Sequence, residues 1–136
     1  MRINLVSDIH LETGYQELPG GDVLVLAGDI CESRKLRQDF HSTKSLYPTG
    51  IPNTEFPRSE FFRVECAKYQ KVFYVMGNHE HYKGYFQKTY AEIAEIMPDN
   101  VTLLEDQCEE YQGVLFVGST LWTDCNRDRK STRLNS

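Results

Sequence analysis

The first hundred residues alternate short apolar runs with polar segments. Runs dense in Ile, Leu and Val cover Arg2–Ser7, Asp22–Ala27 and Lys71–Met76, and each run stops at acidic or polar residues. Continuous apolar runs of this length are typical of strands that are buried on both faces of a sheet. The pattern therefore predicts three buried strands, each followed directly by a polar loop.

Two other segments carry apolar side chains at helical spacing. Apolar residues at i, i+4 and i+7 predict a helix over about Ser59–Gln70, with Ser59 as its N-cap. A second apolar stripe predicts a helix over Phe86–Met97, which Pro98 ends. Strands that alternate with helices indicate an α/β fold with parallel strands, because a helical crossover joins neighbouring parallel strands.

The pattern changes after residue 100. Val101–Leu104, Glu109–Tyr111 and Val114–Val117 read as short strands joined by turns, with Gly113 between the last two. These strands predict the beginning of a second sheet, or its edge.

Residues 32–57 interrupt the regular pattern and predict a long loop. The segment holds Pro48, Gly50, Pro52 and Pro57, and Lys35–Phe40 is the one stretch that fits a helical turn. Loops of this length are uncommon unless they are functional or mobile. We interpret the segment as a solvated insertion; the alternative is a lid whose basic residues approach a phosphate, namely Arg34, Lys35 and Arg37.

The net charge of the chain bears on whether it binds nucleic acid. The net charge is −5, and residues 127–136 contribute four basic residues against one acidic residue, so residues 1–126 carry −8. This acidic body lacks the basic patch of a nucleic-acid-binding protein and would repel a polyanion unless bound cations reversed the local field.

Cysteine spacing and hydropathy bear on the compartment. Cys31, Cys66, Cys108 and Cys125 form no C-x-x-C pair, so we expect buried free thiols in a reducing compartment. The longest apolar runs are far shorter than the roughly 18 to 20 residues that span a bilayer. The amino terminus reaches Asp8 too soon for a signal peptide. A cytoplasmic protein without a membrane segment is the expectation.

The polar residues that follow the three predicted strands carry the candidate chemistry. They are Asp8-Ile9-His10, Gly28-Asp29 and Gly77-Asn78-His79-Glu80. Each segment alone could be a turn, but the carboxyl ends of parallel strands meet at one edge of a sheet, where ligands of α/β proteins bind. Carboxylate, imidazole and amide groups are ligands that Mn, Fe, Zn or Mg accept. The three segments together predict a metal site.

These three segments resemble the first three motifs of the calcineurin-like metallophosphoesterase superfamily. Gly118–Asp124 also resembles a strand segment of its small bacterial and phage members, so the resemblance covers about residues 1–126. It implies a four-layer αββα sandwich, of which this chain holds the first sheet with its helices and the start of the second sheet. It also implies two divalent metal ions, which could be Mn, Fe, Zn, Co or Ni.

The resemblance assigns a role to each motif residue. Asp8 and His10 would bind the first metal, Asp29 would bridge both metals, and Asn78 would bind the second. His79 would act as general acid or stabilise charge on the leaving oxygen. Glu80 and His81 would support the site from outside the ligand shell, with an extra metal ligand at His81 as the alternative.

The implied activity is hydrolysis of phosphomonoesters or phosphodiesters by a metal-bridging hydroxide. The substrate class stays open between phosphoproteins, nucleotide diesters, dinucleoside polyphosphates and nucleic acids. The alternative function is a non-catalytic interaction module that uses the same sandwich. Retention of ionisable residues at all three strand ends favours the enzyme.

The chain departs from the superfamily pattern in its second half. The remaining motifs, an isolated His and a Gly-His-x-His segment, have no counterpart, because no His follows His81. We therefore interpret residues 1–126 as the amino-terminal part of the domain and residues 127–136 as a tail foreign to it, either disordered or a truncation junction. The sequence predicts that the 136-residue chain is a truncated and inactive fragment.

Overall fold

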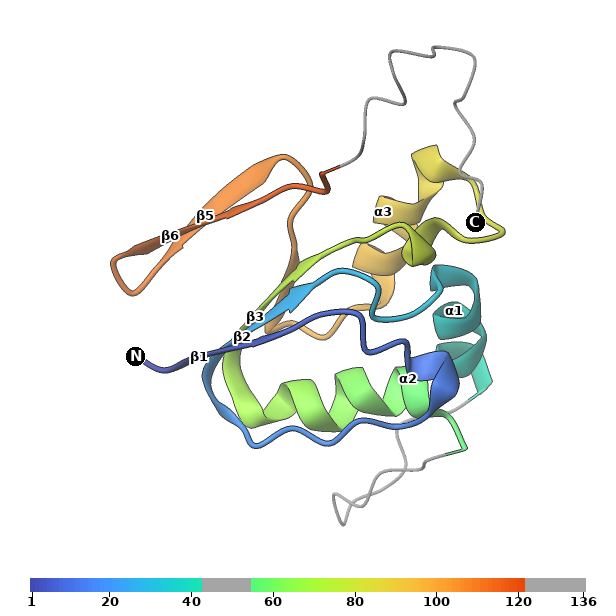
Figure 1. Cartoon of the computed structure of the whole chain (residues 1–136), viewed down its shortest axis with the longest axis horizontal. Helices are drawn as coiled ribbons and strands as arrows, with labels where there is room; N and C mark the ends of the chain where they lie inside the picture. The colour runs from blue at the N-terminus through green and yellow to red at the C-terminus, as the bar shows by residue number, and fades with distance from the viewer. Residues whose placement is uncertain (43–54, 122–136) are drawn as a thin grey trace.

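A computed structural model describes residues 1–42 and 55–121. Its centre is a parallel sheet of four strands, in the order β1-β2-β3-β4 (Figure 1). The strands are β1 (Ile3–Val6), β2 (Gly21–Ala27), β3 (Tyr69–Val75) and β4 (Val101–Leu103). All three strands predicted for the first sheet are present. The prediction that residues 101–104 begin the second sheet is wrong, because this strand pairs with β3 and joins the first sheet as β4.

Helices cover one face of this sheet (Figure 1). They are α1 (Ser33–Ser42), α2 (Pro57–Glu60) and α3 (Phe86–Ile96). Helix α2 continues as a π-helical turn, η2 (Phe61–Glu65), and a 3-10 turn, η3 (Cys66–Lys68). The helix predicted over residues 59–70 is thus present, but Tyr69 already belongs to β3. Its hydroxyl accepts hydrogen bonds from the Asn4 amide and the Gly20 N–H, which tie the start of β3 to β1 and to the residue before β2.

The main core lies between the sheet and these helices. Leu24, Leu26 and Tyr74 point from the sheet into this layer and are fully buried. The Tyr74 ring stacks on Phe62 with centroids 5.6 Å apart, so the helical segment before β3 packs on the strand that follows it. Burying several large apolar side chains in one layer is the main stabilising contribution.

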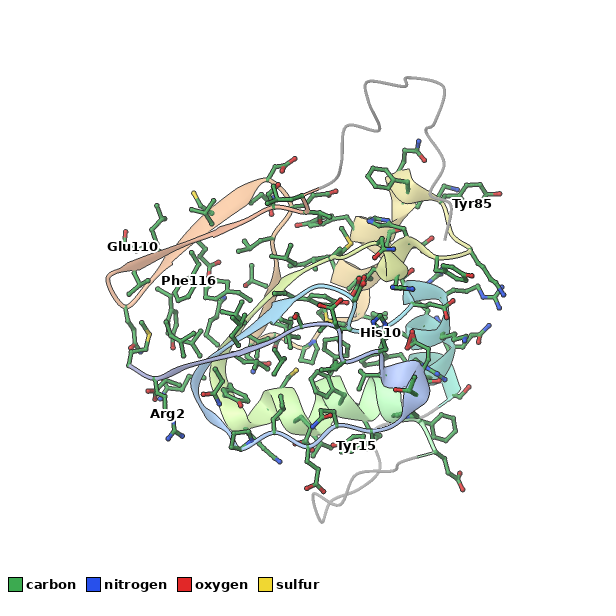
Figure 2. The ribbon with its side chains drawn as sticks, in the orientation of Figure 1. Arg2, His10, Tyr15, Tyr85, Glu110 and Phe116 are labelled. Carbon is green, nitrogen blue, oxygen red and sulfur yellow. The ribbon has the colours of Figure 1, made fainter. Side chains whose placement is uncertain are left out.

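A β-hairpin covers part of the opposite face. Strands β5 (Gln107–Tyr111) and β6 (Val114–Gly118) form a two-stranded antiparallel sheet. The Phe116 ring of β6 stacks on Phe73 of β3, with centroids 4.3 Å apart (Figure 2). The order is helices, parallel sheet, second sheet, which confirms the predicted fold class.

The prediction that every strand is buried on both faces is wrong for β1. Leu5 is 68% exposed, and Ile3 is exposed beside it on the face that the hairpin shares. The hairpin packs on Val23, Phe73 and Leu104, so it covers the part of the face toward β3 and β4 and leaves the β1 edge open. Whether β1 is buried on its second face depends on how far the second sheet extends. The apolar residues of β1 itself do not predict the extent of that sheet.

The predicted long loop over residues 32–57 is also wrong in its first part. Residues 33–42 form the ten-residue helix α1, whose Leu36 is fully buried. A tertiary contact fixes this helix, because the Arg58 guanidinium donates to both carboxylate oxygens of Asp39 at 2.8 and 2.9 Å. Residues 43–54, including Pro48, Gly50 and Pro52, lie outside the described residues.

The basic residues of α1 make surface contacts on this side of the molecule. Lys35 pairs with Glu32 at 3.0 Å, and Arg37 pairs with Glu92 of α3 at 3.4 Å. These pairs agree with the interpretation of an exposed charged segment, and the lid alternative stays a prediction.

The thiols divide into two groups. Cys31 and Cys66 are buried, as predicted, and burial raises the pKa of both thiols. The prediction is wrong for Cys108, which is exposed on β5, because alternate residues of a strand in a two-stranded sheet face away from the core. Cys125 lies outside the described residues.

Candidate metal centre

The three polar loops lie side by side at the carboxyl edge of the parallel sheet. The Asp8 N–H donates to the Gly28 carbonyl at 2.9 Å, and the His10 N–H donates to the Asp29 carbonyl at 3.1 Å. These bonds continue the parallel pairing of β1 and β2 beyond the strands themselves. The loops after neighbouring strands are therefore held in register.

Three side chains from the three loops converge at this edge. Ligand atoms of His10, Asp29 and His79 all lie within 4.8 Å of one another. The rings of His10 and His79 meet edge to face, with centroids 4.7 Å apart. Two imidazoles and a carboxylate form a nitrogen and oxygen donor set that suits divalent first-row metals. The residues present therefore fit a metal ion.

Asp29 is the hub of this cluster. Its carboxylate, 13% exposed, accepts the His79 backbone N–H at 2.9 Å and contacts His79 Nδ1 at 3.0 Å. The Asn78 side-chain amide lies against the Asp29 carboxylate, and with its nitrogen turned toward Asp29 it can donate to both carboxylate oxygens at 2.9 and 3.0 Å. The structure thus brings His10, Asp29, Asn78 and His79 together.

Asp8 lies at the same edge but outside the group of three converging ligand atoms. Its side chain is exposed at the end of β1, and its backbone is tied to Gly28. Its assignment as a metal ligand stays a prediction, as do the separate roles of the other four motif residues.

Three of the candidate ligands have uncommon backbone conformations. Asp8, His10 and Asp29 adopt positive φ angles of 56°, 44° and 53°. L-residues other than glycine avoid this region, and such strain clusters where function requires a particular side-chain position. These are three of the six non-glycine residues with positive φ in the described part of the chain, so the loops hold the candidate ligands in uncommon backbone conformations.

A buried carboxylate organises the loops from below. Glu80 is fully buried in the 3-10 turn η4 (His79–His81). One of its oxygens accepts the N–H groups of Asp29 and Gly77 at 3.0 and 2.7 Å. The other accepts the Ile30 N–H at 2.8 Å and the Tyr74 hydroxyl at 2.6 Å. Burial raises the pKa of Glu80, although its four hydrogen bonds favour the charged form.

We expect Glu80→Gln to destabilise the protein by about 3 kcal/mol. All four partners of Glu80 are donors, and the amide nitrogen of Gln would face two of them, which leaves buried N–H or O–H groups unsatisfied. Urea unfolding followed by circular dichroism measures this loss. The matched change Glu95→Gln, at an exposed position of α3, should leave the free energy of unfolding within error. Equal stability of the two variants would contradict the organising role.

The pairing of Asp29 and His79 shifts the pKa values of both groups. Burial opposes ionisation of Asp29, but hydrogen bonds from the His79 N–H and ring outweigh it and lower the pKa below 3.8. The hydrogen bond to Asp29 raises the pKa of His79 above 6.5, despite partial burial. An ion pair of carboxylate and imidazolium therefore forms in the metal-free protein over a window of pH.

We expect this pair to stabilise the metal-free protein most between about pH 4 and 6.5. The Asp29 contribution is present above 3.8 and is lost as pH falls through its lowered pKa. The His79 contribution is complete below 6.5 and is lost as pH rises through its raised pKa. The difference in unfolding free energy between the parent and Asp29→Asn should peak in this window. A difference that does not vary with pH would contradict the pair.

One residue that ties the loops together is not predicted by the sequence motifs. Glu12 accepts the Glu32 N–H at 2.9 Å, which links the segment after β1 to the segment after β2. Glu12 follows His10 at the same two-residue spacing that separates His10 from Asp8. This repeat of charged residues at alternate positions was the signal available in the sequence.

Comparisons with known proteins agree with this geometry. The family model described as calcineurin-like phosphoesterase matches residues 1–130. The chain is also 30% identical, over 142 aligned residues, to the uncharacterized protein L509 of Acanthamoeba polyphaga mimivirus. The alignment covers 96% of this chain and 48% of that relative, so the chain spans about half the length of the curated protein that it matches. Within the described residues, no helix is long and apolar enough to cross a membrane.

Proposed function

Because this chain belongs to the calcineurin-like phosphoesterase family, we propose that it hydrolyses phosphoester bonds with divalent metal ions held at the carboxyl edge of its parallel sheet. The observation that carries the proposal is the convergence of His10, Asp29 and His79 within 4.8 Å, from three separate loops. In our proposal the substrate is a phosphomonoester or phosphodiester, and the protein works in the cytoplasm.

The proposed ligands divide between two ions. Asp8 and His10 would hold the first, Asn78 would hold the second, and Asp29 would lie between them, where a carboxylate reduces the repulsion of two cations. When bound, divalent ions such as Mn, Fe, Zn, Co or Ni neutralise phosphate charge and lower the pKa of water. These ions also offset the acidic character of the chain, whose net charge is −5.

We assign proton transfer to His79. Asp29 contacts Nδ1 of its ring at 3.0 Å, so the carboxylate fixes the ring orientation and leaves Nε2 for a substrate. The side chain is 39% exposed, which lets a leaving oxygen reach it. In the reaction the oxygen of water bonds to phosphorus and the bond between phosphorus and the leaving oxygen breaks. His79 supplies the proton to the departing alcohol, and the proton that water loses is released to solvent, from which His79 is reprotonated.

We further propose that full activity requires a chain longer than these 136 residues. The exposed Ile3 and Leu5 on β1 form an apolar strip beside the hairpin, where additional strands of the second sheet would pack. The relative that matches this chain is about twice as long as the matched part. Additional residues would also complete the ligand sets, because the described residues bring only three His, Asp or Glu groups within ligand distance.

Metal-dependent hydrolysis of an aryl phosphate tests the proposal. A chain extended to the length of the relative should hydrolyse p-nitrophenyl phosphate with one of the named metals, and chelation should abolish the reaction. The 136-residue chain should bind at most one cation weakly and show no turnover. Undiminished turnover after exhaustive chelation would disprove the metal mechanism. An extended chain that binds metal but hydrolyses no phosphoester would favour the non-catalytic interaction module.

A further inference from the structure

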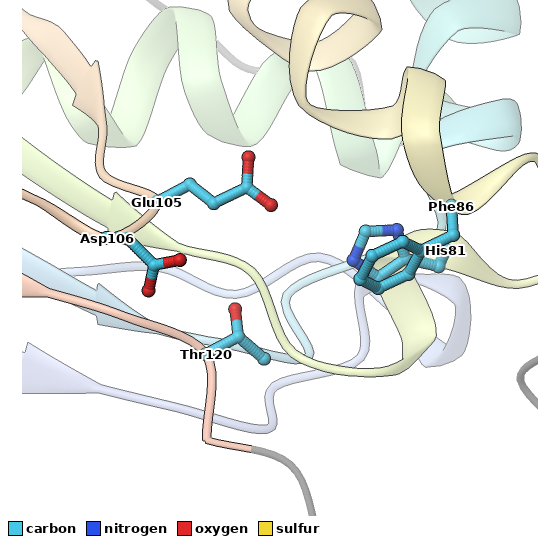
Figure 3. A pocket seen from close by; sticks show the side chains of 5 residues that line it. All are labelled: His81, Phe86, Glu105, Asp106 and Thr120. Atoms are coloured by element: carbon cyan, nitrogen blue, oxygen red, sulfur yellow. The ribbon is translucent and has the colours of Figure 1, made fainter. Parts of the chain in front are cut away.

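A cavity of about 150 Å³ lies at the carboxyl ends of β3 and β4, and one of its lining residues, His81, belongs to the same 3-10 turn as His79 of the candidate metal centre. Figure 3 shows Glu105, Asp106 and Thr120 facing the rings of His81 and Phe86 across this space. Glu105 and Asp106 belong to the link between β4 and β5, and Thr120 follows β6. The segments that flank the hairpin therefore supply one wall, and the turn η4 with the first residue of α3 supplies the other.

The loop that carries the candidate acid also carries part of this cavity. His81 ends the same 3-10 turn that begins with His79. On the other side, the Thr120 hydroxyl donates to the Met76 carbonyl at 2.5 Å, directly before Gly77 and Asn78. A substrate with its phosphoryl group at the metal centre thus has this cavity as a neighbouring space for its alcohol portion.

The polar wall of the cavity presents hydrogen-bond acceptors. Glu105 and Asp106 contribute carboxylates, and the Thr120 hydroxyl has already used its proton on Met76. Asp106 accepts the Ser119 hydroxyl at 2.5 Å, and in residues 1–42 and 55–121 neither carboxylate has a Lys or Arg ion-pair partner. Negative charge on this wall therefore lacks a protein counter-ion in the described part of the chain.

The opposite wall is aromatic. The rings of His81 and Phe86 lie 4.5 Å apart between centroids, with planes inclined by 30°. An aromatic ring facing carboxylates is the environment that organic cations prefer, because the ring face and the carboxylates both attract positive charge. Phosphate, by contrast, would be repelled by Glu105 and Asp106.

Size and spacing favour an organic cation over a bare metal ion. Among the described residues, the possible metal ligands that lie within ligand distance of one another are His10, Asp29 and His79. None of these three residues lines the cavity. A cavity of about 150 Å³ accommodates a molecule of the size of benzene, or roughly six non-hydrogen atoms. An alkylammonium group such as the trimethylammonioethyl group has this size.

We propose that this cavity binds the alkylammonium end of the alcohol that leaves when the phosphoester is hydrolysed. Glu105 and Asp106 neutralise its charge, and Phe86 packs against its apolar surface. The inference rests on the proposed phosphoesterase function, and it specifies that function as selectivity for phosphoesters of amino alcohols.

A matched substrate pair tests the selectivity. Choline phosphate and 3,3-dimethylbutyl phosphate have the same shape and differ in charge at one atom. In the metal-loaded extended chain we expect kcat/KM to be at least tenfold higher for choline phosphate, and this ratio should fall to about one in the double variant Glu105→Gln, Asp106→Asn. The control Glu110→Gln, on the exposed side of β5, should keep the parent ratio. A ratio of one in the parent would overturn the inference while leaving p-nitrophenyl phosphate hydrolysis, and thus the proposed function, intact.

A binding measurement separates the two proposals if no hydrolysis occurs. In the metal-free protein, choline should shift the NMR signals of Thr120 and Phe86 and bind at least tenfold more tightly than 3,3-dimethylbutanol. The double variant should lose this difference. Equal binding of the two alcohols, or no binding of choline, would overturn the cavity assignment. Choline binding by an extended chain that, when loaded with metal, hydrolyses no phosphoester would support the cavity and refute the phosphoesterase function.

Discussion

Replacing His79 by Ala is expected to lower kcat for phosphoester hydrolysis by about 10² to 10⁴ while the bound metal stays nearly constant. The reason is that a general acid acts only in the transition state, whereas the ligands hold the metal in every state. The His79 ring is partly exposed and oriented by Asp29, as a proton donor to a bound substrate must be. Stopped-time assays with aryl phosphates and metal analysis by mass spectrometry measure the two quantities.

The control for this variant is His41→Ala. His41 is an exposed residue in the last turn of α1. Its replacement removes an imidazole from the protein surface and leaves the residues of the metal centre unchanged. Both kcat and metal content should match the parent. If His79→Ala instead lost a metal ion in parallel with its activity, His79 would be a ligand, as its place beside His10 and Asp29 allows, and the assignment as general acid would be overturned.

Gly77→Ala is expected to disrupt the centre itself, with loss of cation binding and a decrease in activity of at least a hundredfold. A Cβ on Gly77 would lie 2.2 Å from Asp29 Oδ1 and 2.6 Å from the Asp29 nitrogen. One of these atoms is backbone, so the Asp29 loop has to move as a whole. The movement would also break the hydrogen bond from the Gly77 N–H to Glu80. Overpacking of this kind typically costs about 1–3 kcal/mol in stability.

The matched control is Gly84→Ala. A Cβ on Gly84 would meet the His81 carbonyl at 3.5 Å, which is an ordinary contact, and the position lies outside the ligand loops. Calorimetric titration with Mn²⁺ and the aryl phosphate assay should therefore separate the two variants. Full cation binding by Gly77→Ala would show that the Asp29 loop tolerates displacement, and would contradict the requirement for close contact between the two loops.

The sequence was sufficient to predict the parallel sheet and the gathering of the polar loops at one edge. Apolar runs of strand length separated by helical stripes leave few arrangements other than an α/β layer, because each run has to be buried and each crossover is helical. Parallel strands then place their carboxyl ends together, so motifs separated by some 20 to 50 residues become neighbours. His10, Asp29 and His79 meet for this reason, and Asp29 contacts Asn78 in the same loop cluster.

Tertiary contacts decided the remaining features. Helix α1 forms in a segment of weak pattern because Leu36 is buried and Asp39 pairs with Arg58, and neither partner is evident from local sequence. Glu80 looks like one more polar residue of a loop, yet it accepts four hydrogen bonds from groups that only the fold brings to it. Burial of Leu5 depends on the extent of a second sheet. In each case the decisive interaction joins residues that are distant in the chain, so the local pattern of apolar and polar residues does not predict it. The strands and the loops that follow them, by contrast, are predicted by this local pattern alone.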